Sequence, residues 1–393
     1  MNKAKVSIVK TGKNPDYAAV MAAVREAVEL VGGIEDIIKP GQLVMVKPNL
    51  AANPGAKESG VCTWPEVSRA VADLVKELGA RPVIAESSAA GVKTEEVMEE
   101  AGYLALRDMG YEVVNLDKAP LAEISVPGGS GIFEPMLTYE LALQVDVIIS
   151  LPTLKCHDQT EITCAMKNLK GLLPDKMKKK FHQEGLFEGV CDLMLALKPR
   201  LTVVDAIICQ EGVGPIFGDP VEMDLILAGK DLVAVDAVSG RLIGYEPEEV
   251  MLTTMGAKAG LGVMEADQIE VVGEVLESVR RRFVRSSEVD LTAEIDDFEM
   301  IYGQATCTGC RNTALSALID MKNADQFKYL PGITVIIGDV DVPAGTKTDN
   351  LVTVGRCVPK ERRMGRHVKG CPPENVEIVR GILGDKAETD RMY

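Results

Sequence analysis

The sequence predicts an α/β protein with a mostly parallel sheet and a smaller C-terminal part. Two observations lead to this fold class. Short apolar runs rich in Val and Ile alternate with longer segments of helical period, an alternation typical of parallel sheets covered by helices. The chain, at 393 residues, is also longer than one compact core usually requires, which favours two domains.

The predicted strands of the large domain are separated by intervals long enough to hold helices. Residues 17–31 and 64–78 have the helical period that such a crossover needs. We therefore expect a Rossmann-like sheet with helices on both faces. The strand predictions cover residues 6–10, 43–49, 81–87, 111–116, 145–152 and 201–207.

The predicted large domain covers residues 1–273. A charged, weakly periodic connector follows at 274–298, and a cysteine-rich α/β domain covers 299–393. Within this last domain we expect strands at 333–342 and 350–357. A helix is expected after the CTGC run, and another straight after Cys371.

Composition excludes several classes of function. The formal net charge of −16 would repel nucleic-acid backbones, so we expect no nucleic-acid partner. No run reaches the roughly 18 apolar residues of a membrane span, and the first residues, MNKAKVSIVK, lack an apolar signal core. These features predict a cytoplasmic protein without a membrane partner, whose nine cysteines are kept reduced.

Four cysteines in the last quarter of the chain predict a metal centre. They lie in the runs CTGC, GRC and GCPP, and glycines before two of them allow close backbone approach. Four thiolates suit a [4Fe-4S] cluster, and a structural zinc site is the alternative. The predicted ligands are Cys307, Cys310, Cys357 and Cys371.

The remaining cysteines are scattered, mostly in apolar runs, and most are expected to be small core residues. They are Cys62, Cys156, Cys164, Cys191 and Cys209.

Several ordered motifs between Ala4 and Gly244 resemble the DUF362 family of prokaryotic proteins. The motifs are VKPNL at 46–50, SLPTLKCHDQTEITCAMKNLKG at 150–171, VVDAIICQEGVGPIFGDP at 203–220 and DLVAVDAV at 231–238. The resemblance implies an iron–sulfur protein. This chain differs from many relatives in having no compact CxxCxxCxxxC run.

The order of the four cysteine motifs is similar to the proximal-cluster segment of nickel–iron hydrogenase small subunits. This second resemblance covers about the last ninety residues. It implies one [4Fe-4S] cluster near a surface or partner site, without hydrogenase activity. Arginines of the segment between Cys357 and Cys371 could form a docking patch for an acidic, ferredoxin-like electron carrier.

The run LKCHDQTEITCAMKNLKG is dense in polar groups and follows a predicted strand. His157 is the first choice as a proton donor or acceptor, with Lys155 and Lys167 as further catalytic candidates. Asn168 and Lys170 are candidates for binding a small anionic substrate or cofactor. A hydrogen-bonded structural histidine and solvated lysines remain the alternatives.

Other polar residues follow predicted strands, where ligands of parallel sheets gather. We include them as candidates for the same anion site, although helix capping or pairing with a lysine is the ordinary role of such carboxylates. They are Lys47, Asn49, Glu86, Asp205 and Glu211. His182, after a run of lysines, is expected at the surface of a flexible segment.

Three functions follow from these features. The first is an anaerobic oxidoreductase in which the cluster exchanges electrons with an anionic substrate or cofactor. The second is a non-redox isomerase or lyase of a small acid, with a structural or Lewis-acid cluster. The third is a protein that carries or matures clusters. An oligomer is compatible with all three.

Overall fold

The computed structural model describes residues 3–293, 295–303, 306 and 308–388. Over these residues a sheet of ten strands forms the centre of the large domain, in the order β12-β1-β11-β10-β7-β2-β3-β4, and β8 and β9 continue it beside β10. The strands are β1 (Ala4–Lys10), β2 (Leu43–Pro48), β3 (Arg81–Glu86), β4 (Val113–Asn115), β7 (Val147–Leu151), β8 (Thr153–His157), β9 (Glu161–Thr163), β10 (Leu201–Glu211), β11 (Asp219–Gly229) and β12 (Ile269–Gly273).

The sheet is mostly parallel, as predicted. The neighbours β3, β2, β7 and β10 all run in one direction. The exceptions are β11, which lies antiparallel to both β1 and β10, and β9, which lies antiparallel to β8. Only seven residues, 212–218, connect β10 to β11, and so short a connection returns the chain antiparallel.

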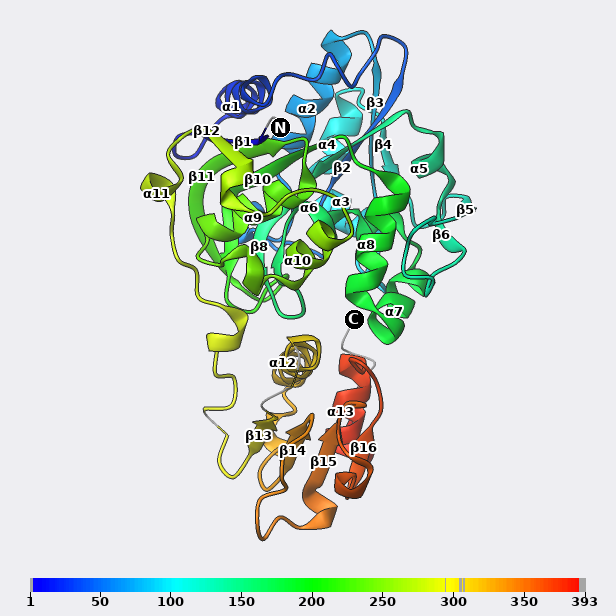
Figure 1. The fold of residues 1–393 in the computed structure, drawn as a ribbon, viewed down its shortest axis with the longest axis vertical. Helices are drawn as coiled ribbons and strands as arrows, with labels where there is room; N and C mark the ends of the chain where they lie inside the picture. Colours follow the sequence, from blue (N-terminus) through cyan, green and yellow to red (C-terminus); the bar gives the residue numbers. More distant parts are fainter. Residues whose placement is uncertain (1–2, 294, 304–305, 307, 389–393) are drawn as a thin grey trace.

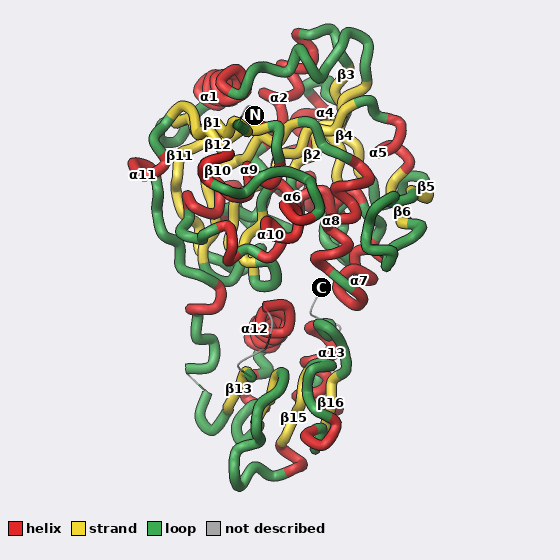
Figure 2. Tube along the Cα trace, viewed as in Figure 1, coloured by secondary structure: helices red, strands yellow, loops and turns green. Residues whose placement is uncertain are grey.

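Helices cover both faces of this sheet (Figures 1 and 2). Successive strand residues alternate between two cores: Met45 packs in one, and Val44 and Val46 pack in the other. The first core contains α6 (Ala165–Asn168), α7 (Asp175–Glu184), α8 (Leu186–Leu197), α9 (Leu232–Leu242) and α10 (Met251–Lys258). The second contains α1 (Tyr17–Leu30), α2 (Pro65–Glu77), α3 (Thr94–Glu100) and α4 (Tyr103–Asp108).

The sequence of α1 explains its position. Val20, Ala23, Val24, Ala27 and Val28 are buried, and this spacing forms one apolar stripe along the helix. The helix begins after Asp16, whose carboxylate accepts a hydrogen bond from the Ala19 amide at 2.9 Å. Such an N-cap stabilises a helix by about 1 kcal/mol.

A two-stranded ribbon, β5 (Leu121–Ile124) and β6 (Met136–Tyr139), lies beside the short helix α5 (Glu140–Gln144) at one side of the large domain (Figure 1). After β12, α11 (Leu276–Val279) begins the stretch predicted as a connector. The first half of the predicted connector is attached to the large domain. Phe283 is fully buried in the core of that domain, and Ser286 Oγ donates a hydrogen bond to the Gly212 carbonyl.

The C-terminal part forms its own parallel sheet, in the order β13-β14-β15-β16. Its helices α12 and α13 contribute to a separate apolar core. Leu315 and Ile319 of α12 also pack on Val213 of the large domain. The elements are β13 (Glu299–Tyr302), α12 (Thr308–Asn323), β14 (Thr334–Ile337), β15 (Leu351–Val354), β16 (Arg366–Val368) and α13 (Asn375–Leu383).

The helices near the cysteines begin at positions other than those predicted. The helix α12 begins at Thr308, so Cys310 lies in its first turn instead of on a preceding loop. The helix α13 begins at Asn375, not directly after Cys371. Two prolines cause this delay, because a residue that precedes proline is disfavoured in the helical conformation.

Across the described parts of the chain, no helix combines the length and apolar character needed to cross a membrane.

Candidate functional site

Polar side chains gather where parallel strands of the large sheet end. Lys47 is the penultimate residue of β2, Glu86 is the last residue of β3, and His157 is the last residue of β8. The next segment, α6 followed by a turn at 169–172, lies beside these ends and supplies Lys167 and Asn168. This is the edge at which open parallel sheets bind ligands.

His157 and Lys167 form a direct amine–imidazole contact. The Nζ atom of Lys167 meets Nε2 of His157. On the other side of the ring, Nδ1 accepts hydrogen bonds from the amides of Gln159, at 2.8 Å, and Thr160, at 3.3 Å. A neutral imidazole that accepts at Nδ1 carries its proton on Nε2, so the ring donates to the Lys167 amine.

Burial and the neighbouring charge of Lys167 lower the pKa of His157 to about 3. Asp158 Oδ1, at 2.9 Å from Nδ1, opposes this shift because it would stabilise only the protonated ring. Burial, followed by Lys170, lowers the pKa of Lys167 well below its usual value. His157 is therefore neutral near pH 7 and able to accept a proton, and Lys167 holds its proton less firmly than an exposed lysine.

A second amine–imidazole contact joins Lys170 to His182. Lys170 Nζ meets Nε2 of His182, which comes from α7. The expectation that His182 is a surface residue of a flexible segment is wrong. His182 is partly buried on α7. The residue before it in the chain, Phe181, is fully buried against Phe133. Burial and Lys170 lower the pKa of His182 well below its usual value.

We define the Lys–His cluster as His157, Lys167, Lys170 and His182. Burial, followed by the charge of Lys178, lowers the pKa of Lys170 to about 7. Among the described residues, no carboxylate lies within ion-pair distance of either amine of the cluster. Unpaired cationic groups in a region of low dielectric constant lose protons, and a bound anion would allow them to keep those protons.

A buried ion pair lies beside the cluster. Lys47 pairs with Glu86, and both side chains are almost fully buried. Burial lowers the pKa of Lys47 and raises that of Glu86, and their mutual attraction opposes both shifts. Lys47 Nζ also donates to Asn168 Oδ1 at 3.2 Å, and Asn168 Nδ2 donates back to the Lys47 carbonyl at 3.0 Å. The candidates Lys47, Glu86 and Asn168 thus form one bonded group.

Gly171 closes this group. A Cβ atom at position 171 would lie 1.7 Å from Glu86 Oε1 and 2.8 Å from Lys47 Nζ. The backbone therefore passes the ion pair so closely that only glycine fits. This contact explains the glycine at the end of the KNLKG run.

The other four predicted residues hold loops together. Lys155 Nζ donates to the carbonyls of Val61, at 2.7 Å, and Pro215, at 3.1 Å. The remaining three bond chiefly to backbone groups: Asn49 to the Val61 carbonyl, Asp205 to the amides of Trp64 and Ile207, and Glu211 to the Val284 amide. Lys155 lies close enough to the Lys–His cluster for its charge to lower the pKa of Lys167.

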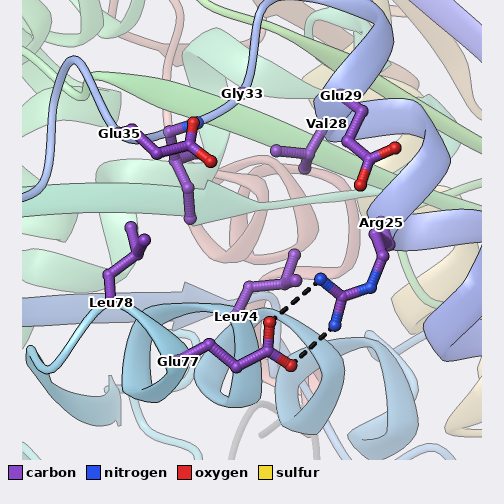
Figure 3. Close-up of a pocket in the computed structure, with 9 residues that line it drawn as sticks. Arg25, Val28, Glu29, Gly33, Glu35, Leu74, Glu77 and Leu78 are labelled. Atoms are coloured by element: carbon purple, nitrogen blue, oxygen red, sulfur yellow. Dashed lines mark hydrogen bonds and ion pairs between the residues drawn. The ribbon is translucent and has the colours of Figure 1, made fainter.

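A surface hollow elsewhere is unrelated to these groups. It lies between α1 and α2 and is crossed by the ion pair of Arg25 and Glu77 (Figure 3). Its lining contains none of the predicted site residues.

Three of the predicted metal ligands, Cys310, Cys357 and Cys371, lie on segments that meet at one edge of the small sheet. Gly355 follows β15, and a Cβ atom on it would lie 3.4 Å from Cys310 Sγ. The Arg356 amide donates to the Gly370 carbonyl at 2.8 Å, which joins the segments carrying Cys357 and Cys371. Cys310 is buried, and the other two are exposed.

Soft thiolate donors on three adjoining segments, with a glycine beside one sulfur, suit a cluster. Cys307 lies outside the described residues, and among those described no three potential ligands are gathered at metal-binding distance. The four-cysteine site therefore stays a prediction. The five other cysteines are all buried, in keeping with core positions.

The model of the family described as "Domain of unknown function (DUF362)" matches residues 44–241. The chain belongs to the DUF362 family. A thylakoid-associated protein, sll1697 of Synechocystis sp. (strain ATCC 27184 / PCC 6803 / Kazusa), is 33% identical over 270 residues, which are 66% of this chain and 79% of that protein.

Among solved structures, the lactate racemase apoprotein from Thermoanaerobacterium thermosaccharolyticum aligns with this DUF362 protein at a TM-score of 0.40 and 10% identity. The alignment covers 98% of this chain and 91% of that one. Similarity at this level carries no inference about activity.

The DUF362 match covers the whole Lys–His cluster and none of the four predicted metal ligands. Two residues of the site went unpredicted in the sequence, His182 and Lys178. Lys178 is buried and donates to the Ser87 hydroxyl at 2.7 Å and to the Ser87 carbonyl at 3.1 Å. Lys178 follows buried Met177 and His182 follows buried Phe181. The four-residue spacing of these two apolar residues indicates a helix with one buried face, and this was the signal available in the sequence.

Proposed function

We propose that this DUF362 protein is an enzyme acting on a small anion that binds at the Lys–His cluster. The observation that supports the proposal is the pairing of each cluster lysine with a histidine instead of a carboxylate. Two lysine ammonium groups without a directly paired carboxylate are costly to maintain in a partly buried site, and the pKa of each lysine is lowered accordingly. An anionic ligand offsets that cost, which is a physical reason for their presence.

The chemistry of the cluster suits proton transfer. His157 is neutral and contacts Lys167, whose pKa is lowered, so the pair can accept one proton from a bound acid and later return it. Lys167, Lys170 and His182 are only partly buried, so a small ligand can approach them from solvent.

We propose further that the protein is an oxidoreductase, with a [4Fe-4S] cluster held by Cys307, Cys310, Cys357 and Cys371. When bound, the cluster would supply or accept single electrons. The thiolate donors and the meeting of their segments support this assignment. A cluster is rarely required for folding in a chain of this size, which favours an electron-transfer role over a structural one.

Anaerobic reconstitution tests the cluster. We expect about four iron and four sulfide per wild-type chain, with an EPR signal after reduction by dithionite. Cys371→Ala should abolish the signal. The matched control is Cys209→Ala, a fully buried cysteine of the large domain, which should retain it. Stoichiometric zinc without sulfide, or loss of the signal in the control alone, would contradict the assignment.

A non-redox isomerase or lyase is the second candidate function. The neutral imidazole of His157 favours it, because removal of a proton from a small acid needs a base and no electron. A chain that turns over its substrate equally well with and without bound iron would support this candidate over the oxidoreductase.

We propose an acidic electron carrier as the partner of the cysteine segment. Between Arg356 and Lys369 lie six basic residues and one acidic residue, in a chain of net charge −16. One of the six, Arg362, is neutralised by Asp339 and Asp341. The exposed Arg356, Lys360 and Lys369 remain around exposed Cys357, which gives a positive surface for a negatively charged protein.

Binding of an acidic plant-type ferredoxin, measured by calorimetry, tests this surface. We expect the affinity to fall as salt rises, and to fall about tenfold in the variant K360E/K369E because two attractive charges become repulsive. The control K13E/K258E changes two exposed lysines of the large domain. Equal losses in both variants would show a general charge effect and overturn the surface.

A further inference from the structure

We infer that the ligand of the Lys–His cluster carries two separate anionic groups, one for each amine–imidazole pair, as a small dicarboxylate or a phosphorylated carboxylate does. This inference rests on the proposed function and specifies its substrate class. The argument depends on how the two pairs are built, on what surrounds them and on what a ligand with one charge would leave unneutralised.

The two pairs share a helical segment but diverge from it. Lys167 and Lys170 are three residues apart, a spacing that places side chains on the same face with Cβ atoms roughly 5–6 Å apart. Lys167 contacts His157 at the end of β8, whereas Lys170 contacts His182 on α7. Because the two histidines come from different elements, the pairs form two adjacent binding positions.

Packing around Phe181 fixes the position of His182, the histidine of the second amine–imidazole pair. Phe181, next to His182, is fully buried, and its ring lies 4.5 Å from that of Phe133. Gly189 of α8 permits this packing, because a Cβ atom there would lie 2.8 Å from the Phe181 ring. Helix α7 is thereby fixed against α8, and His182 is presented to Lys170.

A further lysine, Lys178, adds positive charge near the second amine–imidazole pair. Lys178 lies one helical turn before His182 and further lowers the pKa of Lys170. The carboxylate of Glu86 is already paired with Lys47, and that of Asp158 lies against His157. Neither carboxylate lies within ion-pair distance of Lys170.

A ligand with one anionic group can neutralise only one of the two pairs. The other pair would either stay neutral and gain no charge-assisted contact, or hold a proton while partly buried without a paired anion, which is unfavourable. A second anionic group on the same ligand removes this cost and gains a charge-assisted hydrogen bond. The geometry therefore selects for ligands with two anionic groups over ligands with one.

Calorimetric titration of the full chain with acetate, succinate and inorganic phosphate at pH 7 tests the inference. We expect succinate to bind at least tenfold more tightly than acetate. Lys170→Met should reduce this ratio to about one, because only the His157–Lys167 pair then remains to bind an anionic group. Lys179→Met changes an exposed lysine of α7, the helix that carries His182, and is the control that should change neither affinity. If Lys170→Met folds poorly, His182→Gln replaces it and should give the same loss of the succinate preference.

The outcomes separate the inference from the proposed function. Equal affinities for succinate and acetate would overturn the two-group ligand and leave the anion site standing. Binding of phosphate alone would also overturn it, in favour of one dianionic group that bridges both pairs. Absence of binding by all three probes would contradict the proposed function itself.

Discussion

Replacing Glu86 by alanine should lower the free energy of unfolding by about 3–5 kcal/mol, because a fully buried lysine loses its counter-charge. Lys47 and Glu86 are both almost fully buried, and the remaining acceptors of the Lys47 ammonium, the Pro48 carbonyl and Asn168 Oδ1, carry no formal charge. Urea denaturation of wild type and variant, followed by circular dichroism, measures the difference.

Two further variants make this stability test specific. Glu77→Ala breaks the exposed ion pair with Arg25 and should cost at most about 1 kcal/mol, since solvent screens such pairs. The double variant Lys47→Met/Glu86→Leu removes both buried charges and should recover most of the loss, as apolar replacements of buried ion pairs often do. A Glu86→Ala protein as stable as Glu77→Ala would show that Lys47 is not charged in the folded chain.

The affinity for a small anion should fall about fivefold from pH 7 to 8 and about ninefold from pH 8 to 9, roughly fiftyfold in all, if binding takes up one proton at a group of pKa about 7. Burial and Lys178 lower the pKa of Lys170 to about 7, so its amine is increasingly neutral above that pH. A bound anion stabilises the ammonium form and raises this pKa. Binding above pH 7 therefore requires proton uptake.

Titration with sulfate, whose charge is constant over this range, separates the protein's protonation from the ligand's. Calorimetry in buffers of different ionisation enthalpy reports the number of protons taken up. Lys170→Met should flatten the pH dependence between 7 and 8, and above that range the lysines of pKa about 8, Lys155 and Lys178, continue to titrate. An affinity that rises from pH 7 to pH 9 would refute the linkage.

The sequence predicted the fold well because the strands of the large sheet are buried on both faces. A segment such as residues 147–151 is then apolar throughout and recognisable without knowledge of its neighbours. The antiparallel strand β11 was harder to foresee, since its direction follows from the short connection after β10 and not from its own residues. The delayed start of α13 follows from two adjacent prolines and was readable in principle.

The site was predicted in part. His157, Lys167 and Lys170 lie together in sequence and in space, so one polar run indicated them. His182 was misplaced because a run of lysines before it indicates a solvated surface, whereas tertiary packing buries one side of that helix. Asn49 follows β2 as a ligand would, whereas Asp205 lies within β10. Both bond chiefly to backbone groups, and only the folded chain distinguishes this role from ligand binding.

Helix α12 sets a length scale between the two halves of the molecule. Cys310 lies in its first turn, and Asp320, whose pKa is raised to about 7 by burial and in part by the charge of Asp158, lies near its end. Ten residues of helix separate them, ~15 Å along the axis. A metal–ligand bond is only about 2 Å long, so a substrate beside His157 would not coordinate iron held at Cys310. Electrons would have to cross the intervening protein, and the helix offers a continuous covalent route for them.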